Sequence, residues 1–271
     1  MKKLNFQSFL EIKDFINLCI LRIKDLDLDF FLSIIIPAYN EQRCVGNTLD
    51  KILDYFRNKK YFIEIICVND GSNDSTLNII EERKEANLEN LNNISLKIIN
   101  NENNSGKGYS VRIGGLASTG EYVLFTDADL STPIEEFDRL FNFIKDGYNI
   151  TIGSRDLPGS NIIKRQAIIR EYMGKCFNLL VRKIMNFKYR DTQCGFKLFD
   201  RKSVNNIFPE LKINDFSFDV EILYLAEKLG LKVKEVPITW NNSKDSKVRI
   251  IRDSFRMLLS LIKIKRMHKK I

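Results

Sequence analysis

The chain has 271 residues, of which 44% are hydrophobic and 29% are charged, so it is long enough for one large domain or two small ones. This composition excludes a disordered or collagen-like chain. The five cysteines form no Cys-x-x-Cys pair, and the one histidine, His268, lies close to the C-terminus, which excludes a zinc site of known spacing. The cysteine pattern favours a reducing compartment over a disulfide scaffold.

Positive charge is concentrated at the C-terminal end. The formal net charge is +8, and residues 249–271 contribute most of it through eight Lys or Arg residues against the single acid Asp253. Residues 1–248 are therefore nearly neutral and show no basic face with interleaved aromatic residues. We expect no nucleic-acid partner.

The apolar runs of the chain are short. Each is interrupted by charge well before the roughly 20 residues that a bilayer-spanning helix needs. Residues 1–31 carry too many acids and too weak an apolar centre for a signal peptide. The sequence therefore predicts no membrane-spanning segment.

The first half of the chain alternates between apolar runs and helical patterns. A loose helical pattern over residues 4–23 predicts a helical lead-in within residues 1–31. The expected strands then cover Ser33–Ile36, Ile63–Val68, Leu96–Ile99 and Tyr122–Thr126, and the expected helices cover Gln42–Phe56, a segment that starts near Asp74 or Ser75, and residues 108–118. Buried strands separated by helices predict an α/β fold with a mostly parallel sheet covered on both faces.

The second half loses this strict alternation. Its expected helices cover Ile134–Lys145, Ile162–Met185 and Asp219–Leu229, and its expected strands cover Asn149–Gly153, Asp191–Phe199 and Leu231–Val236. We find no internal repeat and no low-complexity linker. One domain with a C-terminal extension is the preferred organisation.

Two aspartates that follow the fourth apolar run form the sharpest motif. Asp127 and Asp129 lie one residue apart after Tyr122–Thr126, where both carboxylates could converge on one hard cation such as Mg²⁺ or Mn²⁺. An Asp-x-Asp pair is also common by chance. The buried run before it favours the metal interpretation, because uncompensated charge is costly inside the sheet and harmless at its mouth.

Polar or glycine-bearing segments follow the other strands too. Asn69-Asp70-Gly71-Ser72 is equally compatible with an ordinary turn and with a ligand site. Gly106-Lys107-Gly108 is similar to a phosphate-binding loop, but it lacks the third glycine of a dinucleotide fingerprint and the Lys-Ser/Thr ending of a P-loop. Ligands of open α/β sheets bind beyond the carboxyl ends of the strands, which is where these segments lie.

Taken together, these segments resemble the family-2 glycosyltransferases of the GT-A fold, over roughly residues 32–250. More narrowly they resemble dolichyl-phosphate β-glucosyltransferases and their prokaryotic relatives. The resemblance is carried by Ile36-Pro37-Ala38-Tyr39-Asn40-Glu41, Val68-Asn69-Asp70-Gly71-Ser72, Gly106-Lys107-Gly108, Thr126-Asp127-Ala128-Asp129-Leu130-Ser131, Gly153-Ser154-Arg155 and Asp191-Thr192-Gln193-Cys194-Gly195-Phe196-Lys197-Leu198-Phe199. It implies a Rossmann-like GT-A domain, a UDP-sugar donor, inverting transfer and a polyprenyl-phosphate acceptor.

The resemblance also implies roles for residues on the donor side. Pro37, Tyr39 and Glu41 are expected to frame the nucleoside, Asp70 to bind the uracil, and Lys107 to lie along the base and ribose. Asp127 and Asp129 are expected to hold Mg²⁺ or Mn²⁺ against the diphosphate. Related mannosyl-phosphate synthases often have a glutamine as a further ligand two residues after the second aspartate, where this sequence has Ser131, and this departure disfavours a mannose donor.

The acceptor side can be considered from chemistry alone. A phosphate monoester is already nucleophilic at neutral pH, since its second pKa is about 6, so it needs cations more than a strong base. The candidates for binding the acceptor phosphate are Arg155, Lys164, Arg165 and Arg170. A solvated helix start explains Lys164 and Arg165 equally well. Asp219 matches a position where the family keeps an acid, and it could act as a base or orient an acceptor arginine.

The C-terminal residues predict a basic amphipathic helix. At 100° per residue, Ile251, Phe255, Leu258, Leu259 and Ile262 fall on one side, and Arg249, Arg252, Arg256 and Lys263 fall on the other. Such a helix could bind the surface of an anionic membrane, with about 1 kcal/mol from each nearby Lys or Arg. The alternative is a helix docked on the domain with a solvated charged face.

The expected organisation is a helical lead-in (1–31), a GT-A domain (32–240) and a basic tail (241–271), with a donor half over 32–131 and an acceptor half over 132–240. The expected function is transfer of a hexose, with glucose favoured, to a polyprenyl phosphate by a cytoplasmic, peripherally membrane-associated enzyme. Two alternatives stay open: a polysaccharide or protein hydroxyl as acceptor, and a non-catalytic nucleotide-binding membrane adaptor.

Overall fold

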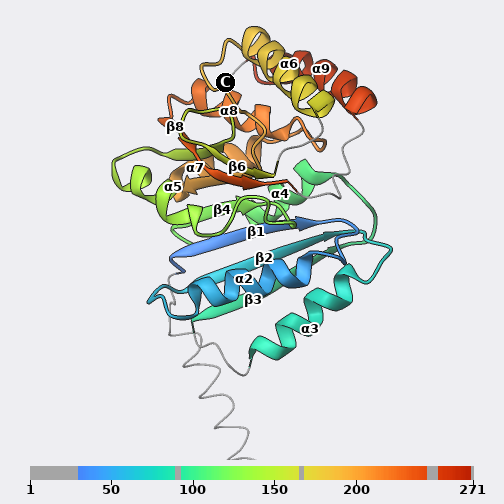
Figure 1. The fold of residues 1–271 in the computed structure, drawn as a ribbon, viewed down its shortest axis with the longest axis vertical. Coiled ribbons are helices and arrows are strands. Elements are labelled where there is room, and N and C mark those ends of the chain that lie inside the picture. Colours follow the sequence, from blue (N-terminus) through green and yellow to red (C-terminus); the bar gives the residue numbers. More distant parts are fainter. Residues whose placement is uncertain (1–29, 89–92, 165–167, 243–249, 270–271) are drawn as a thin grey trace, which may run out of the picture.

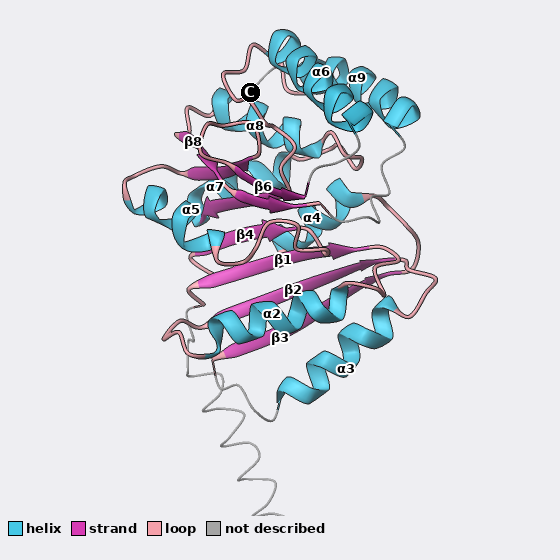
Figure 2. Ribbon diagram, in the orientation of Figure 1, coloured by secondary structure: helices cyan, strands magenta, loops and turns pink. Residues whose placement is uncertain are grey.

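The computed structural model describes residues 30–88, 93–164, 168–242 and 250–269 (Figure 1). The expected helical lead-in lies outside these residues. A seven-stranded sheet in the order β3-β2-β1-β4-β7-β5-β8 forms the centre of the molecule, and helices cover both of its faces (Figure 2). The mostly parallel, doubly covered sheet predicted from the sequence is therefore confirmed.

The sheet has a parallel part and a mixed part. Its strands are β1 (Leu32–Ala38), β2 (Ile63–Asp70), β3 (Ile94–Asn101), β4 (Tyr122–Thr126), β5 (Ile150–Ser154), β7 (Phe196–Asp200) and β8 (Val233–Pro237). Neighbours among β1 to β4 pair in parallel, whereas β7 runs antiparallel to both β4 and β5. Because parallel strands end at the same edge, the loops after β1 to β4 meet there.

The helices divide between the two faces of the sheet. They are α2 (Val45–Arg57), α3 (Thr76–Leu88), α4 (Lys107–Leu116), α5 (Glu136–Lys145), α6 (Ile168–Met185), α7 (Arg201–Ile207), α8 (Phe218–Lys228) and α9 (Ile250–Met267), with a 3₁₀ turn over Phe208–Glu210. One hydrophobic cluster holds buried residues of α2, α3 and α5. The second holds residues of α4 and α6 to α9.

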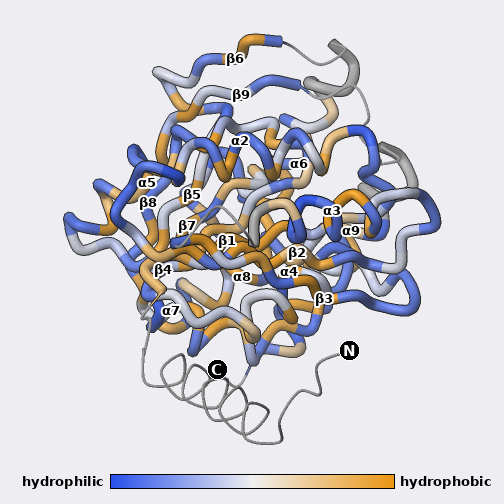
Figure 3. Tube along the Cα trace, turned by 90° about the horizontal axis from the view of Figure 1, so that it is seen from below, coloured by the Kyte–Doolittle hydropathy of each residue, from blue (hydrophilic) through white to orange (hydrophobic). Residues whose placement is uncertain are grey.

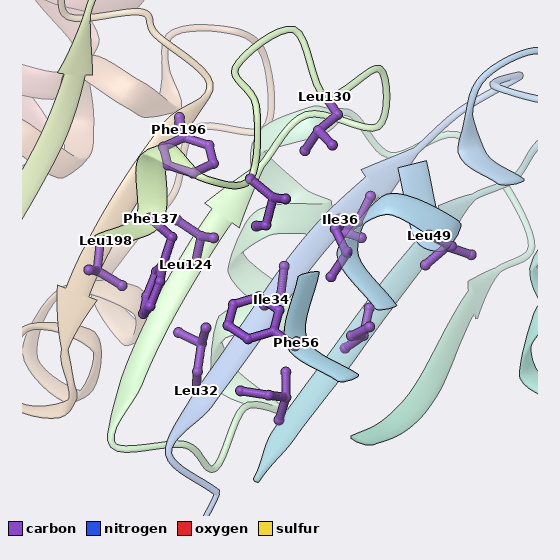
Figure 4. Close-up of a cluster of buried hydrophobic side chains, with 14 of the residues drawn as sticks. Leu32, Ile34, Ile36, Leu49, Phe56, Leu124, Leu130, Phe137, Phe196 and Leu198 are labelled. Atoms are coloured by element: carbon purple, nitrogen blue, oxygen red, sulfur yellow. The ribbon is translucent and has the colours of Figure 1, made fainter. Parts of the chain in front are cut away.

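The strands contribute side chains to both clusters, because successive side chains of a strand point to opposite faces of the sheet. Ile34 and Ile36 of β1 pack with Leu124 and Phe137 in the first cluster (Figure 4), whereas Ile35 belongs to the second. Full burial of each such side chain contributes about 1.5–3 kcal/mol to folding. Figure 3 shows hydrophobic residues concentrated along the central strands and hydrophilic residues on the outer loops.

The structure corrects two predicted boundaries in the second half. Residues Asn161–Lys164 form strand β6, paired in parallel with β9 (Thr239–Asn241), and α6 begins at Ile168 instead of at Ile162. The adjacent β-branched residues of β6 favour a strand once that distant partner is present. The strand expected over Asp191–Phe199 is limited to β7, because residues 191–195 form a loop.

The C-terminal helix α9 is docked on the domain through a face that the sequence analysis did not select. Its residues Met257, Leu261 and Ile264 are buried in the second cluster, against α6 and α8. Leu259 and Ile262, which the predicted apolar face included, are 53% and 47% exposed. The described part of α9 has two apolar sectors on nearly opposite sides at 100° per residue, and a helical wheel cannot tell which one meets the domain.

Candidate active site

The loops after β1 and β2 are tied together at the carboxyl edge of the sheet. Asn40 adopts a positive φ of 53°, its backbone N donates to Ser72 Oγ at 2.9 Å, and its Oδ1 accepts from Asn73 N at 2.8 Å. Glu41 N donates to Thr76 Oγ1 at 2.7 Å, at the start of α3. These bonds hold one wall of the candidate site in place.

The three residues expected to frame a nucleoside share this wall. Pro37 is buried in β1, and Tyr39 and Glu41 follow the strand as half-buried side chains. The structure thus brings them to the edge where β2 ends with Asp70. Their contact with a nucleoside stays a prediction.

Asp70 organises the loop after β3. Its buried carboxylate accepts hydrogen bonds from Asn101 Nδ2 at 2.9 Å, Ser105 N at 3.0 Å and Gly106 N at 2.8 Å. Charge-assisted bonds of this kind contribute about 1.5–3 kcal/mol each. The sequence analysis assigned Asp70 to the uracil, and the structure adds this loop-ordering role, which spacing could not reveal.

The glycines on either side of Lys107 permit a close approach of two backbone segments. A Cβ atom at Gly106, whose φ is 102°, or at Gly108 would collide with the carbonyl oxygens of Asn214 and Ile213. Gly108 N donates to Asn214 O at 2.8 Å. These glycines are therefore explained by packing at the start of α4, where Lys107 is the first residue.

Lys107 forms an ion pair with the first aspartate after β4. Its Nζ lies 2.6 Å from Asp127 Oδ1 and 5.4 Å from the centre of the Phe125 ring. Burial lowers the pKa of Lys107, but the Asp127 and Asp219 carboxylates raise it overall, so the side chain stays cationic. Asp127 N donates to Gly195 O at 3.2 Å, which joins this aspartate to the loop before β7.

Asp129 lies two residues after Asp127, and the two carboxylates repel each other. Burial and repulsion from the Asp127 carboxylate raise the pKa of Asp129, although Ser131 N donates to its Oδ1 at 3.0 Å. A cation between the two carboxylates would relieve that repulsion. Among the described residues no group of three or more His, Cys, Asp or Glu side chains could hold a metal ion, so substrate oxygens or water would have to complete the coordination.

A buried lysine that the sequence analysis did not select lies beside this pair. Lys197 in β7 is fully buried, and its Nζ donates to Asp219 Oδ1 and to Cys194 O, both at 2.6 Å. Burial raises the pKa of Asp219, and Lys197 and Lys107 oppose this only in part. The available signal was a lysine inside the apolar run of Phe196, Leu198 and Phe199.

Arg155 follows β5 and is held by an acid. Its Nε and Nη2 donate to Asp191 Oδ2 and Oδ1 at 2.6 and 2.9 Å, and its guanidinium carbon lies 5.5 Å from the centre of the Trp240 ring. Asp191 is buried, which raises its pKa, but Arg155 outweighs this effect and lowers it overall. Asp191 therefore fixes the direction of the guanidinium.

Of the remaining candidates for the acceptor phosphate, only Lys164 has a described side chain. Lys164 is exposed at the end of β6. Arg165 and the side chain of Arg170 lie outside the described residues. The binding of a phosphate by these residues and by Arg155 stays a prediction.

The sequence identifies the family of proteins to which this site belongs. The sequence matches the family model described as Glycosyl transferase family 2 over residues 33–208, which includes Asp70, Lys107 and both candidate metal ligands. The chain belongs to glycosyl transferase family 2. It is therefore a glycosyltransferase, as the sequence analysis predicted.

Curated members of the family share much of the sequence. A dolichyl-phosphate beta-glucosyltransferase of Dictyostelium discoideum is 35% identical over 258 residues, which cover 88% of this chain and 78% of the relative. The enzyme of that name from Saccharomyces cerevisiae is 34% identical, over 88% of this chain and 75% of the relative. The one from Homo sapiens is 30% identical, over 80% and 69%.

Solved structures of glycosyltransferases have the same fold. Mannosyl-3-phosphoglycerate synthase from Rubrobacter xylanophilus matches with a TM-score of 0.67 and 16% identity, over 90% of this chain and 77% of that one. Glucosyl-3-phosphoglycerate synthase from Mycobacterium tuberculosis, in complex with Mn²⁺, UDP-glucose and glycerol 3-phosphate, matches with a TM-score of 0.61 and 17% identity, over 87% and 83%. The GT-A fold expected from the resemblance is thus confirmed.

Proposed function

We propose that this glycosyltransferase transfers glucose from UDP-glucose to a dolichyl-type polyprenyl phosphate at the cytosolic face of a membrane, with inversion at the anomeric carbon. The similarity of 30–35% to dolichyl-phosphate beta-glucosyltransferases across most of the chain carries the proposal. A UDP-glucose complex of a protein with the same fold supports the choice of donor.

The donor side of the site suits a nucleoside diphosphate. Asp127 and Asp129 end a buried strand beside the ammonium of Lys107. Their carboxylates fit Mg²⁺ or Mn²⁺, because they repel each other and leave coordination positions for phosphate oxygens. A cation bound there supplies neutralisation of the charge that develops on the departing diphosphate.

The transfer itself requires no external proton donor. An oxygen of the acceptor phosphate attacks the anomeric carbon from the side opposite the diphosphate, and the bond from that carbon to the UDP oxygen breaks with its electron pair remaining on UDP. Lys107, whose Nζ lies 2.6 Å from Asp127 Oδ1, places a positive charge beside the aspartates that would face the departing diphosphate.

The surroundings of Asp219 favour a phosphate over a hydroxyl acceptor. A hydroxyl must lose a proton and so needs an accessible base. Asp219 is buried, and its Oδ1 is bound by Lys197, which makes it a poor base for an incoming acceptor. A phosphate dianion does not need that base.

The surface of α6 and α9 supports contact with an anionic membrane. These two helices pack beside each other (Figure 1), and we call their described parts, residues 173–185 and 256–269, the basic helix pair. Its charged residues are all cationic: Lys175, Arg182, Lys183, Arg256, Lys263, Lys265, Arg266 and Lys269. Leu179, Leu180, Leu259 and Ile262 are exposed among them. Cations interspersed with exposed leucine and isoleucine suit the boundary of an anionic bilayer.

No helix in the described parts of the chain is long and apolar enough to cross a membrane.

The function is tested with purified protein, Mg²⁺, a panel of UDP- and GDP-sugars and a polyprenyl phosphate, with the lipid product detected by mass. We expect glucosyl phosphopolyprenol from UDP-glucose and no product from the Asp127→Asn variant. Product from a GDP-sugar alone would overturn the donor. Transfer to a free hydroxyl but not to the phosphate would overturn the acceptor.

Membrane contact is tested separately by co-sedimentation with vesicles. Arg256→Glu with Lys263→Glu should weaken binding to vesicles that contain phosphatidylserine by at least about tenfold, since each basic residue contributes about 1 kcal/mol. Binding to vesicles of phosphatidylcholine alone is the control. Undiminished binding of the charge-reversed variant to both kinds of vesicle would contradict the proposed surface.

A further inference from the structure

The inner face of α9 reaches three segments that surround the candidate site. Met257 Sδ lies 4.0 Å from Gln193 Nε2, in the loop that also holds Asp191 and Gly195. Ser260 Oγ donates to Asp215 Oδ2 at 3.0 Å. His268 directly follows α9, and its Nε2 lies 2.7 Å from Glu221 Oε1 in α8. Asp215 belongs to residues 211–217, which we call the supporting loop, and Glu221 binds the backbone of the same loop.

Glu221 connects His268 to the backbone of the supporting loop. Its carboxylate accepts hydrogen bonds from Lys212 N at 3.1 Å and from Ile213 N at 2.9 Å. Glu221 and His268 are both fully buried. One carboxylate therefore binds the end of α9 on one side and two consecutive peptide groups on the other.

The supporting loop packs against Gly106–Gly108, the segment that contains Lys107. Asn214 O accepts from Gly108 N at 2.8 Å, and the carbonyls of Ile213 and Asn214 leave no room for a Cβ at Gly108 or Gly106. A displacement of the loop would move the first turn of α4. The ion pair between Lys107 and Asp127 depends on that turn.

We propose that His268 is a positioning residue for the donor site: through Glu221 it fixes the supporting loop, which holds Gly106–Gly108 and thereby sets Lys107 beside Asp127. The link to the donor rests on the proposed function, whereas the link from His268 to the Gly106–Gly108 backbone does not. The same helix contributes to the basic helix pair, so its packing on the domain connects the proposed membrane-binding surface to the candidate donor site.

The chemistry of the pair favours positioning over simple stabilisation. A buried polar pair is weak evidence for stability, because apolar residues of similar volume often stabilise a protein equally well. Nδ1 of His268 has no hydrogen-bond partner among the described residues, which is a further cost. What an apolar pair could not supply is an acceptor for Lys212 N and Ile213 N.

The first test is amide hydrogen exchange, followed by mass spectrometry without nucleotide. His268→Ala should raise exchange about tenfold in peptides that cover 106–110 and 211–214, the scale of one lost charge-assisted hydrogen bond, and leave β1 unchanged. Leu140→Ala in α5, on the opposite face of the sheet, is the control for general destabilisation. An increase confined to α9 and 211–214, or an equal increase in β1, would overturn the proposal.

The second test is the affinity for UDP, measured by calorimetry at a temperature where each variant is folded. His268→Ala should weaken binding about tenfold, and His268→Gln, whose amide can donate to Glu221, should restore most of it. If His268→Ala does not fold, Ser260→Ala provides the measurement, with an expected loss of a few fold.

The two proposals fail in different ways. A wild-type protein that does not bind UDP would refute the proposed donor, and hydrogen exchange would still decide the role of His268. Unchanged UDP affinity in both His268→Ala and Ser260→Ala, with a lowered melting temperature, would show a purely structural helix.

Discussion

The proposed donor half, residues 32–131, and the proposed acceptor half, residues 132–240, arrange their charges differently. In the donor half, Asp127 and Asp129 project from the end of a parallel strand, and Lys107 and Asp127 are 26% and 33% exposed. In the acceptor half, the pairs Arg155–Asp191 and Lys197–Asp219, and the pair that Glu221 forms with His268 of the C-terminal tail, each include at least one fully or almost fully buried side chain. Asp127 and Asp129 are thus partly accessible to a cation, whereas Asp191, Asp219 and Glu221 are buried with their partners.

This difference separates residues that perform chemistry from residues that hold others in place. An exposed charge can exchange its partner for a ligand at little cost, whereas breaking a buried pair leaves a desolvated charge. Substitutions in the donor half should therefore affect activity more than folding. Substitutions in the acceptor half that leave a buried charge without its partner should affect folding more than activity.

The largest effect on activity is expected at the aspartate pair. Asp129→Ala or Asp127→Asn should reduce glucose transfer by about a thousandfold or more, because charge on the departing diphosphate would no longer be neutralised. EDTA should inactivate the wild-type enzyme, and Mn²⁺ should restore it. Circular dichroism should show an intact fold. Full turnover in either variant, or in EDTA, would remove the metal from the mechanism.

The largest effect on stability is expected at Lys197. Lys197→Met should lower the free energy of unfolding by about 3–5 kcal/mol, because Asp219 would keep a buried charge without its cation. Lys107→Met, which breaks an ion pair at the mouth of the site, should cost less than about 1 kcal/mol. Urea unfolding at pH 7 measures both values.

A double variant tests whether the unpaired charge of Asp219 causes the loss of stability. Lys197→Met combined with Asp219→Leu should recover most of the stability that the single substitution loses, since neither charge is then left unpaired. Equal losses for Lys197→Met and Lys107→Met would contradict the contrast between the halves.

A smaller effect, specific to the acceptor, is expected at Arg155. Arg155→Lys keeps the charge but loses the two-point bond to Asp191, so the Michaelis constant for polyprenyl phosphate should rise about tenfold while UDP affinity stays constant. The lysine variant is preferable to alanine, which would leave Asp191 buried without a cation. Steady-state kinetics with both substrates provide the measurement. A loss of donor affinity instead would assign Arg155 to the diphosphate.

The smallest effect concerns Glu64, a buried acid of the donor half whose hydrogen-bond donors are neutral. Burial raises the pKa of Glu64, but hydrogen bonds from Ser33 and Thr119, together with Lys97, lower it overall. An acid with a lowered pKa stabilises the fold above its unfolded pKa and loses this contribution as the pH falls. Glu64→Gln should therefore be about 1 kcal/mol less stable than the wild type at pH 7, with the difference shrinking below about pH 4. Urea unfolding midpoints of the wild type and of Glu64→Gln, measured at pH 7 and below about pH 4, test this prediction. A stability difference that stays constant between the two pH values would contradict it.

The sequence by itself determined most of the donor half. Short apolar runs that end in polar residues mark β1, β2 and β4 closely, because a strand buried on both faces is mostly apolar and an unpaired acid is costly inside it. Asp127 and Asp129 were identifiable for the same reason. Family resemblance then supplied the expected donor and acceptor classes.

The tertiary structure decided the acceptor half and the place of α9. Lys197 pairs with Asp219, Arg155 pairs with Asp191, and β6 pairs with β9. These partners are distant in the sequence, so no local pattern identifies them. The described part of α9 has two apolar sectors, and only the shape of the domain selects the one with Met257, Leu261 and Ile264. Local periodicity reports that a residue prefers burial. Which surface buries it depends on contacts between segments that are distant in the sequence.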